Sequence, residues 1–142
     1  MNEKSILLVE DNPDEVNLAR RALARGHVAH RINVVNDGVA ALEFLLACGA
    51  PENRLPEVVL LDLNLPRMNG IELLQRLRAH ARLKTLPVVV LTSSREQGDI
   101  SRCYELGANS YIPKPVDFDH FTEVLRQMSL YWLSLNEPPP TR

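Results

Sequence analysis

Carboxylate, hydroxyl and lysine side chains follow the short apolar runs of this sequence, at the positions where buried strands would end. They are Glu10 and Asp11 after the first run, Asp62 and Thr92 after two later runs, and Lys114 after the last. Ligands of open α/β sheets bind outside the carboxyl ends of the strands, which folding brings to one edge. We therefore expect these side chains to meet at a single site.

The three carboxylates of this set predict a metal site. Carboxylates that converge raise one another's pKa unless they share a cation. Oxygen ligands without sulfur or imidazole nearby select an ion such as Mg²⁺, which keeps several waters and also binds phosphate. Glu10 and Asp11 alone would fit a helix N-cap with a solvated neighbour. Asp62, Thr92 and Lys114 at the ends of other strands favour metal binding by the acidic pair.

Apolar runs and helical periodicity alternate along the chain. Runs rich in Val, Ile and Leu without polar alternation are typical of parallel strands buried on both faces. We expect strands near residues 5–10, 31–36, 57–62, 87–92 and 109–112. We expect helices near residues 14–25, 38–49, 70–82, 96–106 and from about 117. Five such units predict an α/β fold with a doubly wound five-stranded parallel sheet and helices on both of its faces.

Capping residues agree with these boundaries. The helix N-caps are expected at Asp37, Asn69 and Asp117. The glycines expected to follow helices are Gly26, Gly49 and Gly107. One domain is expected over residues 1–135, and the proline-rich stretch 136–142 is expected to be an extended, flexible tail.

Composition argues against several classes of protein. The formal net charge is −2 and the Lys and Arg residues are scattered, which argues against direct nucleic-acid binding. Cys48 and Cys103 form no CxxC pair, so neither a disulfide framework nor a zinc ribbon is implied. We expect neither a signal peptide nor a membrane span, and a cytoplasmic location follows from these expectations.

The motifs that carry the polar set resemble the receiver domain of two-component response regulators over about residues 4–128. They are "LLVEDN", "NDGVAALEFL", "LLDLNLPRMNG", "VVLTSS" and "GANSYIPKP". The resemblance implies a flavodoxin-like sheet order 2-1-3-4-5 and phosphorylation of an aspartate by a partner histidine kinase. It also implies a signalling module, not an enzyme, that acts by protein contact or by transfer to a histidine phosphotransfer protein.

The resemblance assigns the chemistry to individual residues. Asp62 matches the phosphoacceptor, and its carboxylate would attack the phosphorus of a phosphohistidine. The implied Mg²⁺ ligands are Glu10, Asp11, Asp62 and the backbone carbonyl of Asn64. Lys114 matches the ammonium that neutralises the phosphoryl oxygens. Phosphoryl transfer needs these parts because positioning and electrostatic stabilisation supply nearly all of its catalysis.

The resemblance also implies a switch. Thr92 matches a hydroxyl that moves to bind a phosphoryl oxygen, and Tyr111 matches an aromatic that turns inward to fill the vacated space. A local change in charge thereby biases a two-state element. An ordinary strand aromatic remains the alternative for Tyr111. The peptide bond between Lys114 and Pro115 is cis in the family, which would direct the lysine.

The last helix carries an apolar stripe and an apolar end. The stripe consists of Phe118, Phe121, Val124, Leu125, Met128 and Trp132. Beyond it, "LYWLSL" is apolar nearly all round, and exposed patches of this kind mark partner surfaces. We expect residues 130–133 (Leu130, Tyr131, Trp132 and Leu133) to join a homodimer contact, with a well-buried terminal cap as the alternative.

The "YWL" extension and proline-rich tail resemble the single-domain regulators that serve bacterial phytochrome histidine kinases. The implied upstream signal is red light, with a different histidine kinase as the open alternative. Two other functions fit the sequence less well. A phosphatase with an aspartate nucleophile calls for DxD, where this chain has Asn64. A flavin or nucleotide binder calls for a glycine-rich loop, and "EDNPDE" contains no glycine.

Overall fold

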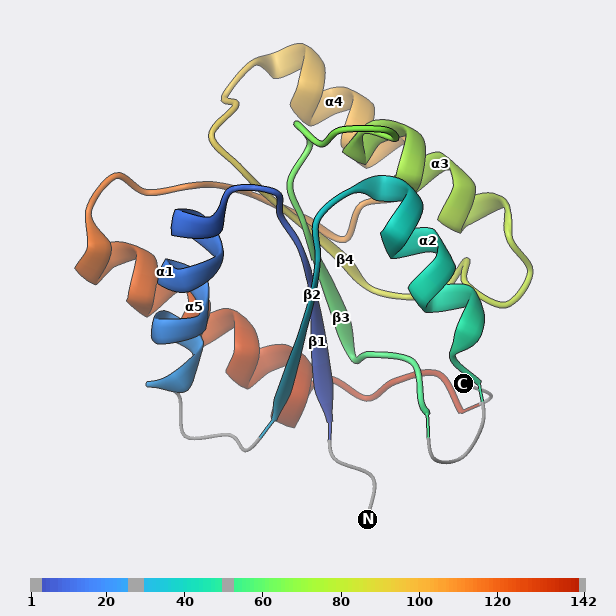
Figure 1. Ribbon diagram of the computed structural model, residues 1–142, viewed down its shortest axis with the longest axis horizontal. Coiled ribbons are helices and arrows are strands. Elements are labelled where there is room, and N and C mark those ends of the chain that lie inside the picture. Colours follow the sequence, from blue (N-terminus) through green and yellow to red (C-terminus); the bar gives the residue numbers. More distant parts are fainter. Residues whose placement is uncertain (1–3, 26–29, 50–52, 141–142) are drawn as a thin grey trace.

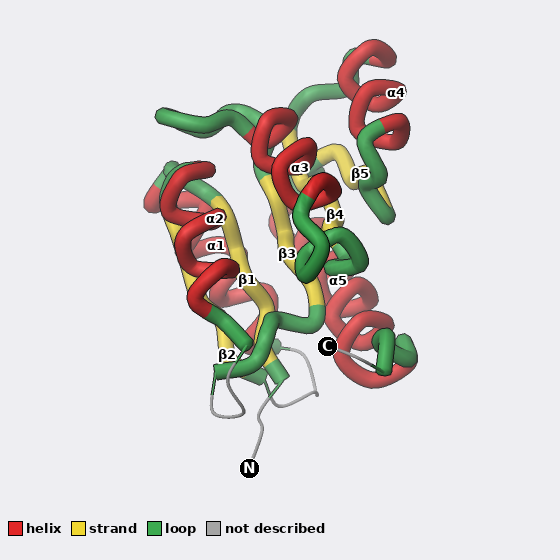
Figure 2. Tube along the Cα trace, turned by 90° about the vertical axis from the view of Figure 1, so that its right-hand side faces the viewer, coloured by secondary structure: helices red, strands yellow, loops and turns green. Residues whose placement is uncertain are grey.

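Five parallel strands form one sheet in the order β2-β1-β3-β4-β5. The computed structural model describes residues 4–25, 30–49 and 53–140. Its strands are β1 (Ser5–Val9), β2 (Arg31–Val35), β3 (Val58–Leu61), β4 (Val88–Thr92) and β5 (Ser110–Pro113). Figure 2 shows them in yellow from the β2 edge to the β5 edge. The predicted fold class and strand order are confirmed.

Helices cover both faces of the sheet (Figure 1). They are α1 (Pro13–Ala24), α2 (Gly38–Ala47), α3 (Gly70–Ala79), α4 (Gln97–Glu105) and α5 (Phe118–Leu130). The α1 and α5 helices pack together on one face, and α2, α3 and α4 follow one another on the other. No helix in the described ranges is long and apolar enough to cross a membrane.

Strand residues alternate between two cores, one under each helical layer. In β3, Val59 and Leu61 pack toward α2 and α3, whereas Val58 and Leu60 pack toward α1 and α5. All four are fully buried, as the uninterrupted apolar run predicts for a central strand. This packing on both faces fixes where β3 ends and hence where the polar side chain that follows it lies.

The predicted helix caps are confirmed where the structure describes them. Asp37 accepts from the Ala40 N–H at 2.7 Å, and Asn69 and Asp117 make the equivalent bonds at 2.9 Å. Gly49 and Gly107 follow helices with φ of 139° and 97°, values that favour glycine. Gly26 lies outside the described residues.

The C-terminal segment is divided between buried and exposed side chains. After α5 the chain continues as a π-helical turn, Tyr131–Leu135. Leu133 is 1% exposed, and its carbonyl accepts from the Lys4 ammonium at 2.6 Å. Leu130, Tyr131 and Leu135 are 39%, 48% and 68% exposed. Leu133 thus serves as a buried cap, and Trp132 is half-buried against the same core. Leu130, Tyr131 and Leu135 remain on the surface.

Candidate functional site

Strand pairing places Glu10 and Asp62 side by side at the carboxyl edge of the sheet. Val9 pairs with Leu61, so the residues that follow them lie at the same level. The Asp62 N–H donates to the Val9 carbonyl at 3.2 Å, and the Glu10 N–H donates to the Val35 carbonyl at 3.0 Å. Glu10 and Asp62 are only 4% and 9% exposed. The structure therefore brings together the two acidic residues that end β1 and β3.

The Lys114 ammonium is a cation that contacts both of these buried carboxylates. Its backbone N–H donates to the Thr92 carbonyl at 2.8 Å, which extends the pairing of β4 with β5. Its ammonium donates to Glu10 Oε1 at 2.8 Å and to Asp62 Oδ2 at 3.1 Å. A third bond goes to Oε1 of Glu15 on α1. Burial by itself lowers the pKa of Lys114, but the hydrogen bonds to Glu10 and Glu15 outweigh it and raise that pKa.

Sequence reasoning did not identify Glu15. Acidic residues are common in the first turn of a helix, where they complement the macrodipole, so nothing distinguishes Glu15 in the sequence. The N-cap of α1 is Asn12, whose Oδ1 accepts from the Asp14 N–H at 2.9 Å. The acidic pair before it does not cap the helix. Only the tertiary structure, which brings the first turn of α1 next to the residue after β5, reveals that Glu15 reaches Lys114.

Burial raises the pKa of Glu10 to about 7. The contacts with Lys114 oppose this shift, and the negative charge of Asp62 adds to it by a smaller amount. The sequence suggested repulsion between carboxylates as the cause of a raised pKa. Desolvation is the larger cause because Glu10 is enclosed between the ends of β2 and β3.

The donor types of this site fit a divalent cation. Carboxylate and carbonyl oxygens next to solvent are what Mg²⁺ prefers. Asp11 is exposed and lines an open cleft with Asn64, while Glu10 and Asp62 point to Lys114. Among the described residues, no three His, Cys, Asp or Glu side chains already form a metal-binding cluster. In this arrangement the Lys114 ammonium supplies the counter-charge.

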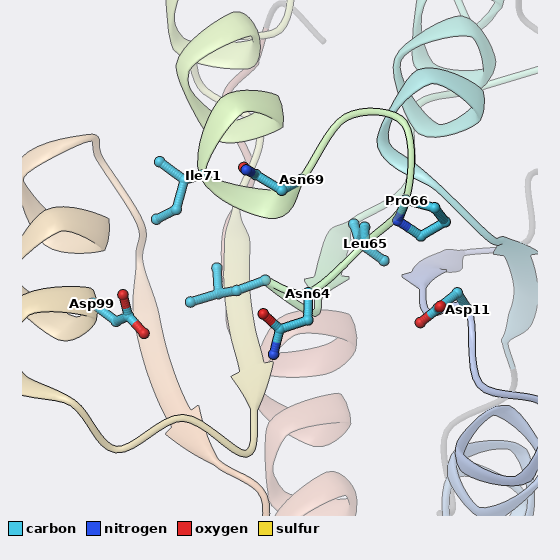
Figure 3. Close-up of a pocket in the computed structure, with 8 residues that line it drawn as sticks. Asp11, Asn64, Leu65, Pro66, Asn69, Ile71 and Asp99 are labelled. Carbon is cyan, nitrogen blue, oxygen red and sulfur yellow. The ribbon is translucent and has the colours of Figure 1, made fainter.

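The cleft lies beside the end of β3 and has a volume of about 540 Å³. Its lining consists of Asp11, Leu63, Asn64, Leu65, Pro66, Asn69, Ile71 and Asp99. Figure 3 shows Asp11 on one side, Asp99 of α4 on the other, and Asn64 between them. Asn64 follows Asp62 by two residues, and its N–H donates to Asp62 Oδ1 at 3.2 Å. Solvent and small solutes can therefore reach the carboxyl edge of the sheet.

Thr92 and Tyr111 connect Asp62 to the loop before α4. The fully buried Thr92 hydroxyl donates to Asp62 Oδ1 at 3.2 Å. The half-buried Tyr111 hydroxyl donates to the Ser94 carbonyl at 2.9 Å, and burial raises the Tyr111 pKa. The Ser94 hydroxyl in turn donates to Asp99 at 2.6 Å. The Ser94 N–H lies 3.5 Å from Thr92 Oγ1, so contacts lead from the Asp62 carboxylate through the end of β4 to Asp99 on α4.

The loop between β3 and α3 is clamped against the start of α2. Arg67 adopts a left-handed conformation with φ of 64°, and its guanidinium contacts both Asp37 carboxylate oxygens at 3.0 Å. A Cβ added to Gly38 would lie 2.1 Å from the Met68 carbonyl oxygen. The motif "NDG" therefore provides a cap, a salt-bridge partner and room for this loop. Sequence analysis had identified only the cap at Asp37.

The peptide bond between Lys114 and Pro115 is trans, so the expected cis bond is wrong for this structure. The trans form is the lower in energy for most X–Pro bonds. The backbone bond from Lys114 to Thr92 and the three carboxylates around the ammonium still direct the lysine into the site.

Comparisons with known proteins agree with this geometry. The family model described as the response regulator receiver domain matches residues 6–126. The "Probable methanogenesis regulatory protein FilR2" of Methanothrix harundinacea is 40% identical over 134 residues, which cover 94% of this chain and 86% of that protein. The response regulator Rcp1 of Synechocystis is 37% identical, over 92% of this chain and 89% of Rcp1.

Two solved structures show the same architecture. The phosphorylated cyanobacterial phytochrome response regulator RcpA is 37% identical and superposes with a TM-score of 0.88, covering 97% of this chain and 99% of RcpA. The Mn²⁺-bound form of Rcp1 is 36% identical with a TM-score of 0.85, covering 96% and 99% of the two chains. One of these relatives is thus phosphorylated, and the other holds a divalent cation.

Proposed function

Because the chain belongs to the response regulator receiver domain family, we propose that Asp62 accepts a phosphoryl group from a partner histidine kinase in two-component signalling. The convergence of Lys114 and Thr92 on Asp62 carries this proposal. Asp62 Oδ2 accepts from the ammonium at 3.1 Å, and Oδ1 accepts from the hydroxyl at 3.2 Å. A cation and a hydroxyl thus flank a carboxylate at the edge of the sheet, beside an open cleft.

The transfer requires an in-line nucleophile and neutralisation of the phosphoryl oxygens. An Asp62 oxygen attacks the phosphorus of a phosphohistidine, and an O–P bond forms as the P–N bond breaks. The leaving imidazole nitrogen keeps the electron pair of the broken bond. Lys114 lies next to Asp62 and is held in its charged form by its carboxylate partners, so it neutralises negative charge on the phosphoryl group.

Glu10, Asp11, Asp62 and the backbone carbonyl of Asn64 are the proposed residues for holding Mg²⁺. When bound, the ion neutralises charge on the phosphoryl oxygens. The buried position of Glu10 next to Asp62 and the place of Asp11 in the cleft support this assignment. The relative Rcp1 supports it as well, because one of its structures holds Mn²⁺.

We also propose that Thr92 and Tyr111 transmit the phosphorylated state. Once Asp62 carries a phosphoryl group, the Thr92 hydroxyl donates to a phosphoryl oxygen instead of to the carboxylate. Since the Ser94 N–H lies 3.5 Å from Thr92 Oγ1 and Tyr111 holds the Ser94 carbonyl, this loop responds to the movement of Thr92. Phosphorylation thereby shifts α4 and the surface around it.

Intact mass after incubation with Mg²⁺ and acetyl phosphate tests the phosphoacceptor. We expect the wild type to gain the mass of one phosphoryl group, and neither Asp62→Asn nor chelated wild type to gain any. Asp119→Asn, which removes an exposed α5 carboxylate, is the matched control and should behave as the wild type. Continuous turnover of phosphate esters would instead indicate a phosphatase. A gain that persists in Asp62→Asn would refute the assignment.

We propose a bacterial phytochrome histidine kinase as the phosphoryl donor. RcpA, a phytochrome response regulator, supports this choice, whereas FilR2 carries a name that refers to methanogenesis. A phosphorylated phytochrome kinase should transfer its label to this chain faster than to Asp62→Asn and faster than an unrelated histidine kinase does. Equal rates from both kinases would contradict the proposed partner. Adding a histidine phosphotransfer protein afterwards would test onward transfer.

We propose that the exposed apolar end of the chain forms a homodimer contact. Leu130, Tyr131 and Leu135 carry the exposed surface, and the half-buried Trp132 contributes the part of its ring that is not packed on the core. Leu133 is excluded because it is buried. Light scattering during size exclusion should show that Leu130→Glu with Tyr131→Glu lowers the mass in solution from that of two chains to that of one. Leu46→Glu, at a 42% exposed position on α2, is the control. A wild type that is already monomeric would refute the contact.

A further inference from the structure

All three N–H donors of the Lys114 ammonium are bonded to carboxylates. An ammonium group has three N–H donors, and those of Lys114 go to Glu10, Asp62 and Glu15. One ammonium group therefore serves three carboxyl groups. A phosphoryl group on Asp62 adds further negative charge and further acceptors at the same place. The phosphoryl oxygens then compete with the carboxylates for the three N–H donors of Lys114, so at least one carboxylate loses its hydrogen bond.

The three carboxylates differ in the energetic cost of losing their contact with the Lys114 ammonium. Glu10 and Asp62 have side chains that are 5% and 11% exposed, so either would lose its ammonium partner in a largely dry environment. The Glu15 side chain is 40% exposed and lies in the first turn of α1, where the helix N-terminus also favours a carboxylate. Water can replace Lys114 around Glu15 at low cost.

We propose that Glu15 is a positioning residue that holds the Lys114 ammonium before phosphorylation and yields it to the phosphoryl group. This inference rests on the proposed function of Asp62. Glu15 competes with the phosphoryl oxygens for the ammonium, and its negative charge also repels them because it contacts the same nitrogen as Asp62. Phosphorylation consequently releases a carboxylate on the first turn of α1.

Glu15→Gln should tighten binding of a phosphoryl stand-in. The variant keeps the side-chain size but removes the charge that attracts Lys114. Titration of the Mg²⁺-loaded protein with beryllofluoride, followed by calorimetry, should give an affinity about two- to fivefold higher than that of the wild type, the range expected for loss of a partly exposed ion pair. Affinity for Mg²⁺ alone should not rise, because a negative charge has been removed. If Glu15→Gln damaged the structure, its affinities for beryllofluoride and for Mg²⁺ would both fall.

Asp14→Asn is the matched control because it removes one negative charge from the same turn of α1. Asp14 is exposed and is not a partner of the Lys114 ammonium, so its substitution should leave beryllofluoride affinity close to that of the wild type. Equal effects of the two substitutions, or weaker binding by Glu15→Gln, would overturn the role of Glu15 alone. Failure of the wild type to bind beryllofluoride would overturn the proposed function together with this inference.

Discussion

Gly38→Ala should destabilise the protein because the added methyl group has no room. Its Cβ would lie 2.1 Å from the Met68 carbonyl oxygen and 2.8 Å from the Met68 Cβ. Real Cβ atoms essentially never approach another heavy atom below 3.0 Å. The start of α2 and the loop between β3 and α3 must therefore separate by nearly 1 Å, and both are parts of packed backbone.

Two opposing effects set the change in the free energy of unfolding that Gly38→Ala causes. Overpacking of this kind costs about 1–3 kcal/mol. The higher helix propensity of alanine returns up to about 1 kcal/mol. The net fall in the free energy of unfolding thus lies within about 0–3 kcal/mol, and we expect about 1–2 kcal/mol, the middle of that range. Urea denaturation should show it as a lower midpoint with an unchanged slope. Affinity for Mg²⁺ should fall as well, because the displaced loop also carries Asn64.

Gly98→Ala is the control for this prediction. Gly98 is the second residue of α4, and a Cβ added there meets nothing within 4 Å. The substitution should raise the free energy of unfolding by up to about 1 kcal/mol through helix propensity and unfolded-chain entropy. If Gly38→Ala were as stable as Gly98→Ala, the close contact with Met68 would not be a real constraint and the reasoning would be refuted.

Three further predictions concern other contacts. Arg78 donates two hydrogen bonds to the Gly107 carbonyl and three more to neighbouring oxygens, so Arg78→Lys should lower the free energy of unfolding in urea by about 2–4 kcal/mol. Burial raises the pKa of Cys103 to about 11, and a thiol reagent at pH 8 should label it only after unfolding, as mass spectrometry would show. The Ala40 N–H and Arg67 lower the pKa of Asp37 below its ordinary value of 3.8, so its contribution to stability is present above that pH and lost as the pH falls below it. Asp37→Asn should therefore flatten the loss of stability that urea titrations show as the pH falls below about 3.8.

Local patterns were sufficient to predict the fold class and the polar residues at the strand ends, while the strand order came from the family resemblance. A buried parallel strand needs a short apolar run, and a helix needs its own periodicity and cap, so both are encoded by neighbours in the chain. The parallel arrangement then places the end of every strand at one edge. Glu10, Asp62 and Lys114 could be grouped from the sequence for this reason, before any distance was known.

Contacts between elements were decided by the tertiary structure. Glu15 and Lys114 are 99 residues apart, and Arg67 and Asp37 are 30 apart, yet each pair forms a salt bridge. Long side chains meet only if their elements cross at a suitable distance and angle, and no local pattern encodes that. The burial of Leu133 depends in the same way on packing between elements, because Leu133 joins the core under α1 and α5.

The sequence by itself therefore determined the alternation of strands and helices, the order of the sheet through its family resemblance, and the polar residues at the strand ends. Hydrophobic periodicity and capping are local, and they are readable without coordinates. The tertiary structure alone decided which carboxylates share Lys114, why the pKa of Glu10 is raised, and which apolar residues of the C-terminal turn remain exposed. Desolvation and ion pairing depend on the surroundings in three dimensions, and packing of the whole chain creates those surroundings.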